Sequence, residues 1–105
     1  MAAEETKETA ARVDYPYAEY RVLVADDLES VTTLIHRELT SRLNCQILIA
    51  HDGDQVMDIL NNEDSVDVLI TDMMMPGLHG LELVRKVKAG YPEINVVVMT
   101  GYASD

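Results

Sequence analysis

The 105-residue sequence contains no phenylalanine and no tryptophan, and its eight lysine and arginine residues face 19 aspartate and glutamate residues. Hydrophobic residues still make up 48% of the chain, so a core must be built from aliphatic side chains and methionine. The formal net charge of −11 argues against direct binding of nucleic acid, because phosphate neutralisation needs clustered basic side chains. The same charge disfavours binding to an anionic membrane surface.

Cysteine and long apolar segments are also scarce. The single Cys45 cannot form an internal disulfide, and neither a secretory signal nor a long apolar span is visible. We therefore expect a cytoplasmic protein, with Cys45 as a small, buried residue at the start of a strand. A length of 105 residues predicts one domain with one core.

The chain divides into a tail and a folded part. Residues 1–19 carry charged and small side chains without a sustained apolar face, which predicts a flexible acidic tail before a domain at 20–105. Four apolar runs within the domain predict strands buried on both faces, at 21–25, 45–50, 66–72 and 94–100.

Three segments between these strands have apolar residues at helical spacing, at 28–43, 54–62 and 78–90. The residues expected to face the core are Leu28, Val31, Leu34, Ile35, Leu39 and Leu43 in the first segment, Val56, Ile59 and Leu60 in the second, and Leu81, Val84 and Val87 in the third. Strands that alternate with helices indicate βαβ units. The fold class is therefore α/β, a parallel sheet with helices on both faces.

Acidic residues follow two of the predicted strands. Asp26 and Asp27 come after the first strand, Asp72 ends the third and Thr100 ends the fourth. The carboxyl ends of parallel strands share one edge of the sheet, so we expect these groups to line one crevice. Carboxylates so close repel one another, and a divalent cation removes that cost; oxygen ligands and room for phosphate suit Mg²⁺.

Asp72 is the candidate reactive group in this crevice. A carboxylate can act as a nucleophile and form an aspartyl phosphate, and Asp72 stands alone with the Asp26 and Asp27 pair beside it. The alternative is that an aspartate after a strand only caps the next helix. Capping could explain Asp27 or Asp72 singly, but it explains poorly the acidic pair, the lone aspartate and Thr100 together.

Three motifs resemble the receiver domain of two-component response regulators: "VLVADD", "DVLITDMMMPGLHGLEL" and "VVVMTGYAS". The resemblance covers residues 21–105 and implies a flavodoxin-like fold. It also implies transfer of a phosphoryl group from a histidine kinase or phosphotransfer protein to Asp72. The resemblance also implies a metal site for Mg²⁺, or Mn²⁺ in its place, with Asp26, Asp27, Asp72 and the Met74 backbone carbonyl as ligands.

The resemblance implies roles for further residues near the site. Thr100 would be the switch hydroxyl, and Met74, Gly101 and Tyr102 would govern phosphoryl access and lifetime. Pro76 and Gly77 are expected to shape the turn after Asp72. Gly80 is either a close-packing position or a tolerated flexible one.

The sequence departs from the family pattern at its carboxyl end. The family has a fifth strand followed by a lysine that contacts the phosphoryl group, and neither is found here, so the chain resembles a truncated receiver with strand order 2-1-3-4. The fourth strand would then be a sheet edge, open to a homodimer. An alternative function is a receiver-like interaction module that no longer switches.

Other functions fit the sequence less well. A haloacid-dehalogenase-type phosphatase needs an aspartate two residues after the nucleophile, where this chain has Met74. No Gly-x-Gly-x-x-Gly motif follows the first strand, which disfavours a dinucleotide-binding enzyme. His36, His51 and His79 lack metal-ligand spacing and are expected to be solvated. The sequence therefore favours a signalling phosphoacceptor over an enzyme.

Overall fold

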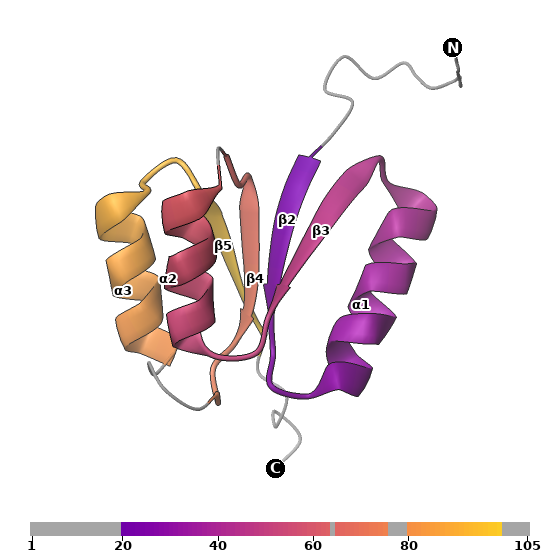
Figure 1. Ribbon diagram of the computed structural model, residues 1–105, viewed down its shortest axis with the longest axis horizontal. Helices are drawn as coiled ribbons and strands as arrows, with labels where there is room; N and C mark the ends of the chain where they lie inside the picture. The colour runs from indigo at the N-terminus through magenta and orange to yellow at the C-terminus, as the bar shows by residue number, and fades with distance from the viewer. Residues whose placement is uncertain (1–19, 64, 76–79, 100–105) are drawn as a thin grey trace.

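The chain forms a four-stranded parallel sheet with helices on both faces (Figure 1), in a computed structural model that describes residues 20–63, 65–75 and 80–99. The strands are β2 (Tyr20–Ala25), β3 (Cys45–Ala50), β4 (Val68–Asp72) and β5 (Asn95–Met99). The helices are α1 (Glu29–Arg42), α2 (Gly53–Asn62) and α3 (Gly80–Gly90). The predicted α/β class is confirmed.

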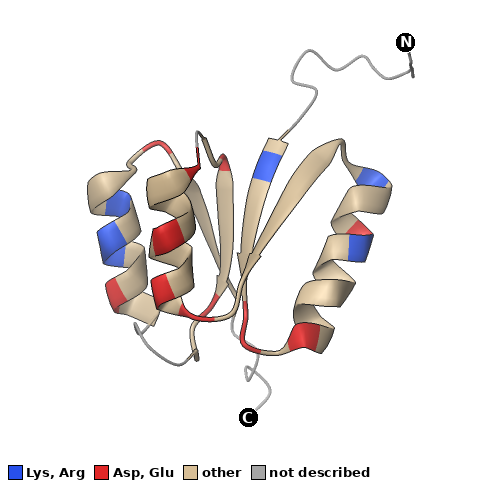
Figure 2. Ribbon diagram, viewed as in Figure 1, with Lys and Arg blue, Asp and Glu red and all other residues tan. Residues whose placement is uncertain are grey.

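The strands lie in the order β3-β2-β4-β5, which is the predicted 2-1-3-4 order along the chain. All three pairings are parallel, and the register sets Ala25 of β2 opposite both Ala50 of β3 and Thr71 of β4. The carboxyl ends of the strands therefore meet at one edge of the sheet. Figure 2 shows Asp and Glu residues in the loops at this edge.

The main core lies between the sheet and the pair α2 and α3, on the left in Figure 1. Its fully buried members include Leu23, Leu69, Val56, Leu83 and Val87. Side chains alternate between the faces of a strand. The neighbours Val22 and Val24 are buried on the opposite face, where α1 contacts β2 and β3.

The inward face of α1 was predicted incorrectly in part. Leu28, Leu34 and Leu43 are 52%, 49% and 51% exposed. Leu28 and Leu43 are the residues that flank the helix, so they do not continue its apolar stripe. The buried position is instead Thr32, whose hydroxyl donates to the Glu29 carbonyl oxygen at 3.0 Å. A threonine can be buried here because the helix itself satisfies its polar atom.

The inward face of α3 is also shifted from the prediction. Leu81 is 61% exposed, whereas Leu83 and Val87 are fully buried at a helical spacing of four. Two of the strands are shorter than predicted, yet Val66 and Ile94 just before them are buried in the same core. The apolar runs thus predicted burial better than they predicted strand ends.

Several predicted features lie outside the described residues. They are the tail at 1–19, Pro76, Gly77, His79, Thr100, Gly101 and Tyr102. Among the residues that the structure describes, no helix is long and apolar enough to cross a membrane. Cys45 begins β3 as predicted, but it is only partly buried.

Candidate functional site

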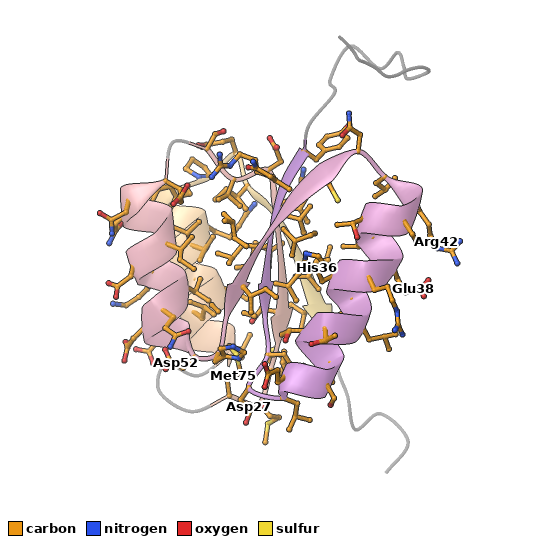
Figure 3. The ribbon with its side chains drawn as sticks, turned by 45° about the vertical axis from the view of Figure 1, so that its right-hand side comes forward. Asp27, His36, Glu38, Arg42, Asp52 and Met75 are labelled. Carbon is orange, nitrogen blue, oxygen red and sulfur yellow. The ribbon has the colours of Figure 1, made fainter. Side chains whose placement is uncertain are left out.

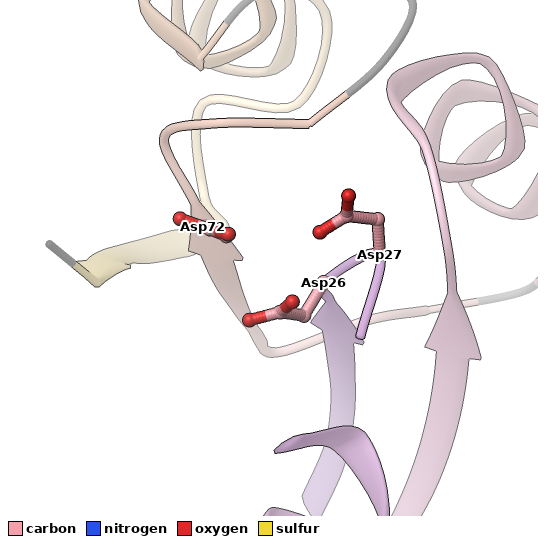
Figure 4. Close-up of side chains that lie close together, drawn as sticks. All are labelled: Asp26, Asp27 and Asp72. Carbon is pink, nitrogen blue, oxygen red and sulfur yellow. The ribbon is translucent and has the colours of Figure 1, made fainter. Parts of the chain in front are cut away.

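Three carboxylates meet at the carboxyl edge of the sheet (Figure 4). One oxygen atom from each of Asp26, Asp27 and Asp72 lies within 4.8 Å of the other two. The cause is the strand register: Ala25 pairs with Thr71, so the residues that follow them, Asp26 and Asp72, are neighbours across β2 and β4. The predicted convergence of the acidic pair with Asp72 is therefore present.

Two of the three carboxylates are buried. Asp26 and Asp72 are only 4% and 8% exposed, while Asp27 is exposed to solvent. Burial raises the pKa of Asp26, and the negative charges of Asp72 and Asp27 raise it further, against the opposing effect of the Leu28 amide. The ion pairs seen within the described residues, Arg21–Glu63 and Arg42–Glu38, involve none of these carboxylates.

Backbone amides orient the two buried carboxylates. The N–H of Leu28 donates to Oδ1 of Asp26 at 2.9 Å, and the N–H of Met74 donates to Oδ1 of Asp72 at 3.2 Å. Each bond spans two residues and therefore fixes the carboxylate to its own turn.

Helix capping does not account for these aspartates. The residue that caps α1 is Leu28, which makes no side-chain capping bond. The described aspartate that does cap a helix is Asp52, whose Oδ1 accepts the Gln55 N–H at 2.8 Å at the start of α2. Asp72 ends β4, eight residues before α3 begins at Gly80.

The chemistry of this donor set fits a hard divalent cation. All three groups supply oxygen, two are buried, and they carry negative charge at close range. Mg²⁺ is commonly held by a few carboxylates and keeps water or phosphate in its other positions. The exposed side at Asp27 gives such ligands access.

Gly80 packs against the loop that follows Asp72. A Cβ atom at Gly80 would lie 2.9 Å from both Cα and the carbonyl oxygen of Met73, and 2.7 Å from its sulfur. Real Cβ atoms do not approach backbone so closely, so the start of α3 requires glycine here. This contact favours the interpretation of Gly80 as a close-packing position.

The methionines of this loop have different surroundings. Met75 is 6% exposed and belongs to the core. Met74 is 65% exposed, so its side chain does not pack in that core.

Sequence reasoning missed one residue beside the carboxylates. His51 is exposed, as predicted for a solvated histidine, but its Nδ1 lies 3.1 Å from the carbonyl oxygen of Asp26. No spacing rule links residues 25 positions apart. The signal that could have found it is the strand order, because β3 ends at Ala50 next to the end of β2.

Comparisons with known proteins identify a family and relatives of similar sequence. A family model described as the response regulator receiver domain matches residues 22–105. The chemotaxis protein CheY homolog of Campylobacter jejuni is 37% identical over 82 residues, which cover 76% of this chain and 63% of that protein. The transcriptional regulatory protein CpxR of Escherichia coli is 31% identical over 85 residues, or 81% of this chain and 35% of that protein. The chain thus spans less than two thirds of these relatives.

The fold also matches solved structures. The signal receiver domain of an HD domain-containing protein from Pseudomonas fluorescens superimposes with a TM-score of 0.74 over 79% of this chain and 65% of that chain, at 23% identity. At this level of identity the match supports the fold alone. It agrees with the flavodoxin-like arrangement seen here.

Proposed function

Because this chain belongs to the family of response regulator receiver domains, we propose that it accepts a phosphoryl group on Asp72 from a histidine kinase or a phosphotransfer protein. The family acts in two-component signalling. One observation carries the proposal: Asp72 is a buried carboxylate whose oxygen lies within 4.8 Å of oxygens from Asp26 and Asp27.

The chain's own groups prepare Asp72 for this reaction. The Met74 N–H holds Oδ1 of Asp72, which leaves Oδ2 to attack phosphorus. A P–O bond to Oδ2 forms as the P–N bond of the donor phosphohistidine breaks, and the leaving imidazole keeps the electron pair and gains a proton from solvent. The product is an aspartyl phosphate.

A metal ion completes the proposed site. Mg²⁺, or Mn²⁺ as a substitute, would be held by Asp26, Asp27, Asp72 and the Met74 backbone carbonyl. When bound, it supplies positive charge to the phosphoryl oxygens. Without it, an incoming phosphoryl group would meet three carboxylates, two of which are buried.

Most of the remaining proposed roles rest on motif positions outside the described residues. Thr100 would be the switch hydroxyl, and Gly101 and Tyr102, together with Met74, would govern access to the phosphoryl group and its lifetime. Pro76 and Gly77 would shape the turn between β4 and α3. Residues 1–19 would form a tail before the domain. The proposal places the chain in the cytoplasm, where Cys45 stays reduced.

Mass spectrometry tests the proposed reaction. The intact chain is incubated with Mg²⁺ and acetyl phosphate, beside the Asp72→Asn variant and a control, Asp54→Asn, which changes an exposed aspartate on α2. We expect wild type and Asp54→Asn to gain the mass of one phosphoryl group and Asp72→Asn to gain none. No gain in wild type, with Mg²⁺ still bound, would instead support an interaction module.

We also propose that β5 is a contact surface between two copies of this chain. β5 is an edge of the sheet, and Val97 and Val98, which point to opposite faces, are 49% and 40% exposed. Asn95–Met99 contains neither a charge nor a proline, the residues that usually protect an edge strand. The other edge strand, β3, is contacted by both α1 and α2.

The proposed occupant is a second β5, paired antiparallel about a two-fold axis. Centred on Val97, this pairing sets Val96 opposite Val98 and Asn95 opposite Met99, so no charge is buried. A two-fold contact uses the same strand twice and closes after two copies. The strand's sequence is therefore compatible with its own copy, despite the chain's net charge of −11.

Sedimentation over a range of concentrations tests this contact. Val97→Lys places a charge on the edge strand, and Leu43→Lys is the control, since Leu43 is 51% exposed beside β3, at the opposite edge of the sheet. We expect dimers for wild type and Leu43→Lys and a monomer for Val97→Lys. A wild-type chain that stays monomeric at the highest concentration would refute the contact.

A further inference from the structure

We infer that His51 is a positioning residue for the acidic site: its imidazole holds the peptide group that joins Asp26 to Asp27. The inference rests on the proposed metal site and adds a residue from a different strand. Its observation is the distance of 3.1 Å between Nδ1 of His51 and the carbonyl oxygen of Asp26. A carbonyl oxygen can only accept, so Nδ1 is the nitrogen that carries the proton.

Both polar groups of the Asp26 main chain are bound to the end of β3. The Asp26 N–H donates to the carbonyl oxygen of Ala50 at 3.1 Å. The Asp26 carbonyl oxygen accepts from Nδ1 of His51, the residue that follows Ala50. The first bond continues the sheet ladder by one residue, whereas the second comes from a side chain. The ring of His51 therefore adds a hydrogen bond between the two segments beyond Ala25 and Ala50, where the regular pairing of β2 and β3 ends.

The turn that carries His51 is itself braced against α2. The His51 N–H donates to Oε1 of Gln55 at 2.8 Å, and the Gln55 N–H donates to Oδ1 of Asp52 at 2.8 Å. Through Gln55, these two bonds fix the backbone of the turn to the first turn of the helix. The backbone of His51 is thus held in place by α2. Figure 3 shows Asp27 and Asp52 at the same end of the molecule.

The peptide that His51 holds matters most for Asp27. Asp26 is buried and its carboxylate accepts the Leu28 N–H, so several contacts fix it. Asp27 is exposed, so packing restrains its side chain less. The direction of its Cα–Cβ bond depends on the orientation of the Asp26–Asp27 peptide. Loss of the His51 bond should therefore disturb the Asp27 carboxylate more than Asp26.

Metal titration tests this role. Isothermal calorimetry measures the Mg²⁺ dissociation constant for wild type, His51→Ala, His51→Gln and the control His36→Ala, which removes an exposed histidine on α1. Groups that orient metal ligands typically change affinity by about 10- to 100-fold when they are removed. We expect His51→Ala to bind about tenfold more weakly, His51→Gln to recover most of the affinity through its amide donor, and His36→Ala to match wild type.

A purely structural role for His51 gives a different pattern. His51→Ala would then melt at a lower temperature but bind Mg²⁺ with unchanged affinity, and that outcome would overturn the inference. Equal weakening in His36→Ala would overturn it as well, because the effect would not be specific to the turn.

A measurement without metal separates this inference from the proposed function. The ¹⁵N heteronuclear NOE of the Asp27 amide reports how firmly its peptide is held. We expect a lower value in His51→Ala than in wild type or His36→Ala, all without Mg²⁺. An unchanged value refutes the positioning role even if wild type binds Mg²⁺. A wild type that binds no Mg²⁺ refutes the metal site, and the NOE then decides the role of His51 alone.

Discussion

Replacing Gly80 with alanine should destabilise the fold and disturb the acidic site together. The new Cβ would lie 2.9 Å from two backbone atoms of Met73, the residue that follows Asp72. The sulfur of Met73 can rotate away, but its Cα and carbonyl oxygen cannot move without the loop. Either the loop shifts away from Asp72, or the start of α3 shifts away from the sheet.

The magnitude follows from two opposing effects. Overpacking of a well-packed contact typically costs about 1–3 kcal/mol, and alanine in place of a helical glycine returns at most about 1 kcal/mol. Taking the middle of the overpacking range, about 2 kcal/mol, the net loss in the free energy of unfolding is about 1–2 kcal/mol. For a domain of this size that corresponds to a fall in Tm of about 5–15 °C.

Gly90 provides a matched control at the other end of the same helix. A Cβ atom at Gly90 would meet nothing within 4 Å. Gly90→Ala should therefore keep the helix-propensity gain without the overpacking cost, and its Tm should rise by a few degrees. The two variants make the same chemical change and should have opposite effects on Tm.

Thermal unfolding by circular dichroism and phosphorylation by acetyl phosphate should be measured on both variants. We expect Gly80→Ala to melt lower and react more slowly, because displacement of Met73 also disturbs the Met74 N–H bond to Asp72. A Gly80→Ala chain that melts like wild type would refute the packing argument. A lower Tm with an unchanged reaction rate would show that α3 moves and the loop does not.

Two further predictions concern a charge and a buried side chain. The pKa of Asp26 is raised above its ordinary value of 3.8, so between its unfolded and folded pKa values the folded state binds more protons, and stability falls as pH rises through that window. Asp26→Asn should therefore raise the Tm of the metal-free chain at neutral pH but leave it unchanged at pH values below both pKa values. The variant should also lose the rise in Tm that Mg²⁺ causes in wild type. A lower Tm of the variant at neutral pH would contradict this reasoning. Leu83→Ala should cost about 2–5 kcal/mol in denaturant unfolding, because Leu83 is fully buried. Leu81→Ala should cost less than about 0.5 kcal/mol, since Leu81 is 61% exposed. Equal losses of stability in Leu83→Ala and Leu81→Ala would contradict the assignment of the buried face of α3.

The convergence of the carboxylates could be predicted from sequence because it follows from a parallel sheet, whereas the strand order came from the resemblance to receiver domains. Once Val22–Ala25 and Val68–Asp72 are parallel neighbours, the acidic residues at their ends must meet. Parallel strands buried by helices also need continuous apolar runs, which are visible in the sequence. These features depend on order along the chain and tolerate errors of one or two residues.

The helix faces were harder to predict because they depend on phase and on where each helix begins. Leu28 and Leu43 match the apolar spacing of α1 but flank the helix, so their side chains do not follow its stripe. Thr32 is polar and was not expected in the core, yet its hydroxyl bonds to the Glu29 carbonyl within the helix. Local hydrogen bonds of this kind cannot be counted before the backbone is known.

The acidic site adds an energetic cost that the fold must offset. Asp26 and Asp72 are buried as neighbours. Burial, together with the like charges of Asp72 and Asp27, disfavours the ionised form of Asp26. The backbone amides of Leu28 and Met74 offset part of that cost within each turn. A cation held by the same oxygens would offset more, and at 100 times its dissociation constant it would stabilise the folded chain by about 2.7 kcal/mol. Stability and metal occupancy are therefore linked in this domain, because the buried Asp26 that is proposed to bind Mg²⁺ weakens the metal-free fold.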